Sequence, residues 1–547
     1  MWLEKSAFAT FACALFAFVG CERDPVRIDT EGYVGSAECT RCHESHARSF
    51  EATFHRSMTR EATPENARAL FDDQTLTYGG ITARMTTSGS GARPFVVTLT
   101  RDGVLLDRVV VDRFVGSGRH QQLLAREDDR WVRLPVAWNV EEQRWFHMNE
   151  AFLTADPEGL ESAHVSTADF ARHVTSWNDN CVFCHNVRPA PHQDATGHFE
   201  TEVAELGVAC EACHGPGAAH VRANENPLRR YALHHGGIGE HAADESIINP
   251  ARLSPDRSAE VCGRCHGQRI TTRIERFMHE GDSYMPGDDL SAFSTPITRD
   301  TPLHGDTQAF ASRFWPSGTP RLTAYEYQGL LQSPCEGLTC TSCHGMHEGA
   351  PRNQLRPSVA DDVMCTQCHE EIRGEARAEH IGISEADHSN VQCIDCHMPR
   401  IVFGLRSVHI SHRIEVPTAQ NEGQPSACNL CHLNDTESLF AGDPIERAVM
   451  ANALGLPERR SAHEPRALLL ETMRDDPYPA VRAIAWTSLR ALEPSLALSR
   501  FQSTLPAAER RSLVDAIASE LDVEVAPPSE HAEARAQASA HAIEIGE

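Results

Sequence analysis

The chain has 547 residues and a net charge of −27, with 50 lysine or arginine residues against 77 aspartate or glutamate residues. Binding to nucleic-acid phosphates requires a basic face, so this composition makes nucleic acid an unsuitable partner. Of the 19 cysteines, all but Cys13, Cys21 and Cys335 belong to one repeated motif, which leaves no cysteines for a disulfide framework.

The N-terminus has the pattern of a signal peptide over residues 1–20. Lys5 precedes an apolar run from Ala7 to Val19, which is too short to span a bilayer. Gly20 and Cys21 then resemble a bacterial lipobox, in which the cysteine is lipidated and becomes the first residue. Phe18 stands where leucine is usual, so cleavage without a lipid anchor stays an alternative. Either way we expect a periplasmic or outer-membrane-attached protein with no transmembrane helix in the mature chain.

Residues 33–72 form the first predicted module, which begins with a Cys-x-x-Cys-His motif. The segment after the motif predicts a helix, because Phe50, Phe54 and Met58 recur every four residues on one face.

Residues 73–150 predict an inserted antiparallel β module. From about Thr75 to Trp138 apolar and polar residues alternate, as in half-buried strands. Asp102 and Gly103 lie between two β-branched runs and predict a two-residue hairpin turn.

Residues 151–436 predict a multihaem core, because most Cys-x-x-Cys-His motifs lie there, four of them between Cys340 and His432. Two cysteines three positions apart match the two vinyl groups on one edge of a porphyrin, and the adjacent histidine then lies beneath the iron. Structural zinc would not require a histidine after every second cysteine. We therefore expect eight covalently attached haem c groups. The motifs consist of Cys39, Cys42 and His43; Cys181, Cys184 and His185; Cys210, Cys213 and His214; Cys262, Cys265 and His266; Cys340, Cys343 and His344; Cys365, Cys368 and His369; Cys393, Cys396 and His397; and Cys428, Cys431 and His432.

The sequence between these motifs is rich in Gly, Pro, Asp and His and has weak hydrophobic periodicity. Such a segment cannot form an ordinary side-chain core, so we expect it to fold only with haem attached.

Residues 437–524 predict a helical domain. Asp443 and Pro444 are typical of a helix start, and Gly455 of a helix end. Helices separated by Asp-Pro turns favour HEAT-like repeats, although a small helical cap without repeats fits equally well. Residues 525–547 are rich in Ala and Glu and predict a disordered tail. The expected fold class is mainly α: a haem-packed core with an inserted antiparallel β module and a C-terminal helical repeat-like domain.

A low-spin haem needs a second axial ligand, commonly another histidine. Thirty histidines are present, and local context singles out five of them as distal ligands. These are His55, His220, His347, His388 and His412, with less specific context for His279, His304 and His380. Met398 is too near His397 to reach the opposite face of the same haem, and Cys335 reads as an inert buried thiol.

Lysine ligation of a catalytic iron is excluded for the mature chain. The single lysine, Lys5, lies inside the predicted signal peptide.

Several phrases of the sequence resemble cytochrome c-554 and larger bacterial multihaem cytochromes that share its opening module. They are "YVGSAECTRCHESHARSFEATFHRSM", "LPVAWNVEEQRWFH", "SWNDNCVFCHN", "GVACEACHGPGAAH", "GLTCTSCHGMH", "CIDCHMPR" and "SACNLCHLND". The resemblance implies closely packed bis-histidine haems, and it carries over to His55, His220, His347 and His412. The family usually has a histidine before "WN..C"; here either His164 or His173 is a candidate.

Three functions fit these patterns. The first is an electron carrier that serves redox partner proteins through mostly bis-histidine haems. The second is an oxidoreductase that acts on a small nitrogen or sulfur compound at a five-coordinate haem, since hydroxylamine oxidoreductase-like enzymes also hold eight haems. In the third, the C-terminal helices dock a partner enzyme, and a truncation after Thr436 would leave the haem spectra intact.

Overall fold

The computed structural model describes most of the chain from residue 32 onward. Its described residues are 32–88, 94–157, 164–235, 244–348, 353–360, 362–373, 376–382, 388, 391–417, 423–433, 437–456, 460–461, 464–497, 500–527, 531, 533–534, 543 and 545. The predicted signal peptide and the predicted lipidation site Cys21 lie outside these residues. Within them, no helix combines the length and the apolar character that crossing a membrane requires.

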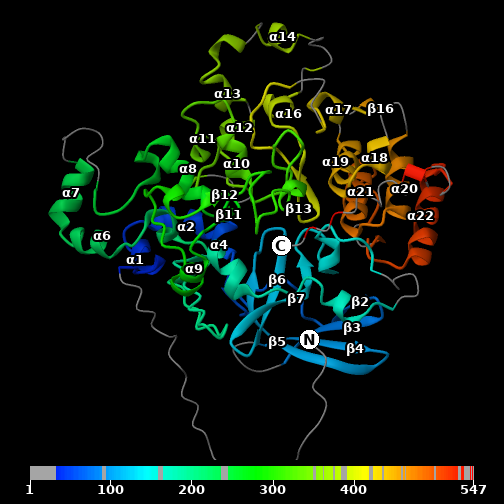
Figure 1. Ribbon diagram of the computed structural model, residues 1–547, viewed down its shortest axis with the longest axis horizontal. Coiled ribbons are helices and arrows are strands. Elements are labelled where there is room, and N and C mark those ends of the chain that lie inside the picture. The colour runs from blue at the N-terminus through cyan, green and yellow to red at the C-terminus, as the bar shows by residue number, and fades with distance from the viewer. Residues whose placement is uncertain are drawn as a thin grey trace, which may run out of the picture.

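The largest regular element is an eight-stranded antiparallel sheet, drawn in blue and cyan at the bottom of Figure 1. Its strands follow each other in chain order: β2 (Gln74–Tyr78), β3 (Ile81–Thr87), β4 (Phe95–Arg101), β5 (Val104–Val115), β6 (His120–Glu127), β7 (Arg130–Asn139) and β8 (Arg144–His147). A short strand, β1 (Arg60–Glu61), pairs with β5 and ties the first module to the sheet.

The predicted β4–β5 hairpin is confirmed. Asp102 and Gly103 both have positive φ, at 51° and 77°, as a type I′ turn requires. Alternate side chains of the sheet enter one apolar core, in which Trp138 and Trp145 lie edge to face with ring centroids 5.3 Å apart. The alternation in the sequence thus reflects a sheet with one face packed on its own core.

Short helices carry the cysteine motifs. A Cys-x-x-Cys-His motif needs only about one helical turn, because its two cysteines and its histidine span five positions. The helices outside the C-terminal region, with or without a motif, are the following before residue 200: α1 (Ser36–Thr40), α2 (Glu44–Glu51), η1 (His55–Ser57), η2 (Met148–Glu150), α3 (Thr167–Phe170), η4 (Trp177–Cys181) and α4 (Val182–His185). From residue 200 to 300 they are α5 (Cys210–His214), α6 (Ala218–Ala223), α7 (Pro227–His235), η5 (Pro250–Arg252), α8 (Pro255–Gly263), α9 (Ile274–Glu280) and η6 (Leu290–Ala292). After residue 300 they are η7 (Ala311–Arg313), α10 (Glu326–Leu331), α11 (Cys340–Cys343), α12 (Pro357–Ala360), α13 (Val363–Thr366), η8 (Glu370–Ile372), α14 (Ala376–Ile381), α16 (Cys393–His397) and α17 (Ala427–Cys431).

Four two-stranded ribbons connect these helices. They pair β9 (Asn186–Val187) with β10 (Glu205–Leu206), β11 (Arg269–Ile270) with β12 (Thr295–Pro296), β13 (Val402–Gly404) with β14 (Ser407–His409), and β15 (His432–Leu433) with β16 (Arg460–Ser461).

The expectation of a mainly α fold is wrong. Helices make up 38% of the structure and strands 19%, and the antiparallel sheet is large. Two physical reasons explain the error. The sheet runs through seven successive strands, more than the hairpin signal indicated, and the motif helices last only about one turn. The helix expected through Met58 is likewise broken, since α2 ends at Glu51.

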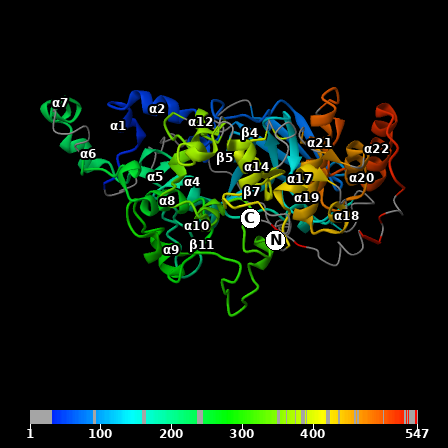
Figure 2. The same cartoon turned by 90° about the horizontal axis from the view of Figure 1, so that it is seen from above.

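The C-terminal helices are α18 (Glu437–Ala441), α19 (Pro444–Leu454), α20 (Pro465–Asp475), α21 (Pro479–Leu492) and α22 (Ala507–Leu521). Asp443 caps α19 through a capping box, with Pro444 in its first turn and Gly455 after its end, as the sequence predicted. Figures 1 and 2 both place α20 and α22 at the end of the molecule opposite α6 and α7.

The C-terminal helices share one hydrophobic core with the preceding region. This core combines Trp315, Ile401 and Phe403 with Leu469, Trp486 and other side chains of α19–α22. Part of the segment expected to be a disordered tail is also fixed, because Ile545 forms an antiparallel bridge with Leu153.

Candidate haem sites

The motif backbone brings two thiols and one imidazole to the same side of a single turn. In the first motif the His43 N–H donates to the carbonyl of Cys39 at 2.9 Å. The same bond from the histidine to the first cysteine occurs in the motifs of His266 and His344, at 2.8 and 2.9 Å. This arrangement fits attachment to one porphyrin edge with the imidazole beneath the ring.

Six motif histidines lie opposite a second histidine ring. The ring centroids are 6.1 Å apart for His43 and His220, 6.0 Å for His214 and His347, 5.9 Å for His266 and His55, 6.4 Å for His344 and His412, 5.9 Å for His397 and His380, and 6.1 Å for His432 and His388. Two imidazoles that bind one metal from opposite faces, with metal–nitrogen bonds of about 2 Å, have ring centres about 6 Å apart. The six separations therefore leave room for one iron each.

All five histidines singled out as distal candidates lie opposite a motif histidine. The sixth partner, His380 on α14, had only weak context, because nothing near it in the sequence indicates that it meets His397. His279 instead lies 5.8 Å from His192, and His173 is buried beside the Thr154 hydroxyl at 3.1 Å. The separation and angle of His192 and His279 are close to those of His55 and His266, but neither His192 nor His279 belongs to a Cys-x-x-Cys-His motif.

His43 has a second histidine neighbour, His46, at 6.3 Å. Both belong to one short segment, and residues three apart project to the same side of a helix. His46 stacks instead on His347, at 4.6 Å and 5°. His220 is thus the better placed partner for His43.

The Nδ1 atoms of several paired histidines face oxygen acceptors. Carbonyl oxygens of Ile248, Asn353 and Glu415 lie 2.7, 2.8 and 2.8 Å from Nδ1 of His214, His344 and His397, respectively. A hydrogen bond from Nδ1 fixes the ring and directs Nε2 toward a metal, as is usual for histidine ligands.

Burial keeps these rings neutral, which metal ligation requires. It lowers the pKa of His55 to about 4 and also lowers the pKa of His214, His344, His347 and His412.

His266 differs because a carboxylate faces its Nδ1. Glu326 Oε2 lies 3.7 Å away. Burial by itself would raise the pKa of Glu326, but the ion pair with His266 outweighs it and lowers the pKa to about 2. Likewise burial would lower the pKa of His266, and Glu326 raises it to about 9.

Large apolar side chains beside the motifs are exposed. Val363, two residues before Cys365, is 46% exposed, and Val416, next to Glu415, is 75% exposed. Such surfaces fit the porphyrin faces that the motifs would hold against them.

Parts of the chain match known cytochromes. Three family models match: cytochrome c552 over residues 379–447, the doubled CXXCH motif over residues 333–374, and cytochrome c554 and c-prime over residues 140–215. The chain is a multihaem c-type cytochrome. It binds haem c covalently and transfers electrons.

Two similar proteins are also cytochromes. Multiheme cytochrome MtrA of Shewanella baltica (strain OS185) is 21% identical over 259 residues, which cover 46% of this chain and 69% of that protein. The crystal structure of outer cell wall cytochrome OcwA aligns with 85% of this chain and 99% of its own, with 18% identity and a TM-score of 0.47.

Cysteines of different motifs of the cytochrome lie near one another, and the helices that carry them pack together: α1 against α5, α8 against α11, and α16 against α17. Cys39 lies near Cys210, Cys184 near Cys265, Cys262 near Cys340, and Cys365 near Cys393, close enough for one thiol of each pair to shift the pKa of the other. Electrostatic proximity further relates Cys213 to Cys265, Cys343 to Cys365, and Cys396 to Cys428. Each cysteine marks an attachment edge, so neighbouring cysteines bring neighbouring porphyrin edges together.

These contacts define an order of motifs. With the eight motifs numbered in chain order, the first lies next to the third, and the third to the eighth then follow one another in space in their chain order. The second motif joins from the side, through Cys184 and Cys265.

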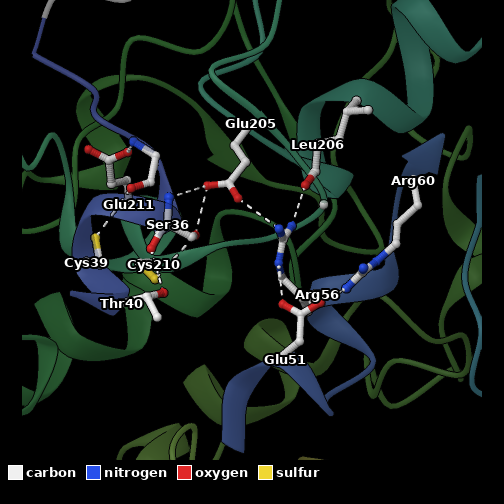
Figure 3. Close-up of polar contacts among 12 residues, drawn as sticks. Ser36, Cys39, Thr40, Glu51, Arg56, Arg60, Glu205, Leu206, Cys210 and Glu211 are labelled. Carbon is white, nitrogen blue, oxygen red and sulfur yellow. Dashed lines mark hydrogen bonds and ion pairs between the residues drawn. The ribbon is translucent and has the colours of Figure 1, made fainter. Parts of the chain in front are cut away.

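Figure 3 shows the polar network that holds the first motif of the cytochrome against the third. Glu205 accepts hydrogen bonds from the Ser36 backbone and hydroxyl at 2.9 and 2.8 Å, and it pairs with Arg56 at 2.9 Å. The Ser36 hydroxyl also lies 3.4 Å from Cys210 Sγ.

Glu211, inside the third motif, holds both sides of this junction. Its buried carboxylate accepts hydrogen bonds from the backbone N–H groups of Val34, Gly35 and Gly217, at 2.7 to 3.2 Å. It thereby fixes the chain just before the first motif and just before α6, which carries His220.

A Glu211→Gln variant is expected to be less stable by about 1–3 kcal/mol. The substitution removes the negative charge and turns one carboxylate oxygen, which accepts hydrogen bonds, into an amide NH2 group that faces backbone N–H donors. Thermal unfolding followed by far-UV circular dichroism measures the change. The exposed Glu200 supplies the control Glu200→Gln, which is expected to unfold like the wild type. Equal unfolding of both variants would contradict the assigned role of Glu211.

Proposed function

We propose that this cytochrome carries eight haem c groups outside the cytoplasm and passes electrons through them between redox partner proteins. At least six irons would be held between two histidines. The observation that carries the proposal is the set of six ring pairs, with centroids 5.9 to 6.4 Å apart, each joining a motif histidine to a histidine from elsewhere in the chain.

Ligation from both faces favours conduction. Haem, when bound, supplies a one-electron iron couple. The paired histidines would hold the iron from both sides and would leave no coordination position for a substrate at those six sites. The cysteine contacts set adjacent attachment edges side by side, which shortens the path for electron transfer.

The proposed location follows from the sequence. The pattern at residues 1–20 is that of an export signal, and Cys21 offers a lipid attachment point. A lipid anchor there would keep the cytochrome at a membrane surface, within reach of its redox partners.

The holoprotein is expected to have the mass of the mature chain plus eight haems. Intact-mass spectrometry after production with a c-type cytochrome maturation system measures this. A Cys365→Ala/Cys368→Ala variant is expected to lose one haem, whereas Cys335→Ala is expected to keep all eight. Fewer than eight haems in the wild type would refute the count.

Electron paramagnetic resonance of the oxidised holoprotein tests the ligation. The signals of the six paired sites are expected to be low spin. A dominant high-spin signal that shifts with nitrite or hydroxylamine would instead favour an oxidoreductase with a five-coordinate haem.

A further inference from the structure

Glu326 is a charged side chain aimed at one particular motif. It is the first residue of α10, and its Oε1 accepts the Ala324 N–H at 3.2 Å. The other oxygen, Oε2, is buried, accepts no hydrogen bond among the described residues and lies 3.7 Å from His266 Nδ1.

Close packing of α10 against the fourth motif holds Glu326 in this position. The Tyr327 N–H donates to the His266 carbonyl at 2.9 Å. A Cβ atom added to Gly263 would lie 2.6 Å from the Tyr327 ring, and one on Gly267 3.0 Å from Tyr327 Cβ. Glycine at both positions therefore lets α10 approach the motif from one side.

The fourth motif is also where the order of motifs branches. Its cysteines lie near those of three other motifs: Cys265 lies near Cys184 of the second and Cys213 of the third, and Cys262 lies near Cys340 of the fifth, whose helix α11 packs against α8. Electrons that pass between the second motif and the rest would go through this site.

We propose that Glu326 is a positioning residue that lowers the reduction potential of the haem held by Cys262, Cys265 and His266, at this branch. The inference rests on the proposed ligation of iron by His266. A buried negative charge beside Nδ1 makes the imidazole a stronger donor and stabilises ferric over ferrous iron.

The contrast with other sites supports this assignment. His214, His344 and His397 face neutral carbonyl oxygens. His369 does face a carboxylate, Glu371, at 3.4 Å, and the two histidines are similarly exposed, at 57% and 52% for His369 and His266. The carboxylates differ, because Glu371 is 69% exposed and Glu326 is 25% exposed, so solvent screens the charge of Glu371 more strongly.

A low potential suits a branch point. An electron that reaches such a site is held weakly and moves on to a neighbouring haem of higher potential. The site would then pass electrons on to the haems of the second, third and fifth motifs and would not store them.

The geometry also supplies a spectroscopic label for this haem. The rings of His55 and His266 are inclined at 79°, whereas those of His214 and His347 are inclined at 9°. Perpendicular imidazole planes give a low-spin ferric signal with an unusually large maximal g value, and near-parallel planes give an ordinary rhombic signal. The two classes can be followed separately in one sample.

The test is a redox titration of the full-length holoprotein monitored by electron paramagnetic resonance. In Glu326→Gln the large-g signal is expected to disappear at a higher potential than in the wild type. A tenfold change in the ferric-to-ferrous ratio at fixed potential corresponds to about 59 mV for one electron. The rhombic signal of the His214–His347 site should stay at its wild-type potential.

Two variants serve as controls. Glu326→Asp keeps the charge and is expected to restore most of the wild-type potential, and Glu371→Gln removes the exposed carboxylate and is expected to change nothing. If the large-g signal of Glu326→Gln titrates as in the wild type, or at lower potential, the proposal is overturned.

Measurements of haem content and spin state distinguish a failure of the proposed role of Glu326 from a failure of the proposed electron-transfer function. A wild type with eight haems and low-spin signals keeps the proposed function even if Glu326→Gln shifts nothing. Should Glu326→Gln fail to bind eight haems, the wild type decides: its large-g signal must disappear at lower potential than the rhombic signals, or the proposal fails.

Discussion

In a His347→Ala variant, one haem is expected to change from low spin to high spin. His347 lies opposite His214, with centroids 6.0 Å apart and planes 9° apart. Alanine would leave one axial position to water or open. The oxidised variant should show a new high-spin signal in electron paramagnetic resonance, and the reduced variant should bind carbon monoxide at one site.

His46→Ala is the matched control for this change. Its ring stacks on His347 at 4.6 Å, so it removes a similar side chain from the same place. Because His46 lies on the same segment as His43, it is not expected to bind iron, and all signals should stay low spin. A high-spin site in His46→Ala, or none in His347→Ala, would contradict the assigned ligand pairs.

Local features of this cytochrome could be predicted because their signals are local. A Cys-x-x-Cys-His motif acts within one helical turn, an Asp-Gly turn sets two φ angles, and Asp443 with Pro444 forms a helix start from adjacent residues. In each case the residues that cause the structure are only a few positions apart in the sequence.

The pairing of histidines could be predicted only in part, because it depends on contacts between distant segments. His347 meets His214, more than a hundred residues away, and His55 meets His266. The sequence of a motif does not indicate which distant histidine will lie opposite its own histidine in the folded chain. His380 was therefore only a weak candidate, and Glu326 had no sequence signal, since its role depends on the packing of α10.

The C-terminal helices illustrate the same limit for domains. Their helical pattern suggested a separate unit, and a truncation after residue 436 was expected to leave the haem spectra intact. Trp315 and Phe403 of the preceding region nevertheless share one hydrophobic core with Leu469 and Trp486. Truncation would expose that core, so surface substitutions on α22 are a cleaner test of partner docking.

Replacing Arg482 with methionine is expected to destabilise the protein by about 3–5 kcal/mol, because it leaves the Asp156 carboxylate without its nearest counter-charge and two carbonyl oxygens without their donor. The Arg482 side chain is fully buried. Its guanidinium pairs with Asp156 at 2.8 Å and donates to the carbonyl oxygens of Asp476 and Ser503. It thus joins α21 to the segment that follows the β module. Chemical denaturation followed by circular dichroism measures the loss.

Arg466→Met, on α20 of the same helical region, is the control. Arg466 forms two ion pairs, with Glu464 and Glu493, against the single ion pair of Arg482, but its side chain is 34% exposed. Exposed pairs contribute at most about 1 kcal/mol, so this variant should remain close to the wild type. Equal losses of stability in the two variants would contradict this prediction, because they would show that burial of the arginine does not determine its contribution to stability. A large loss confined to Arg482→Met would mean that burial, and not the number of ion pairs, decides how much an arginine of the helical region contributes to stability.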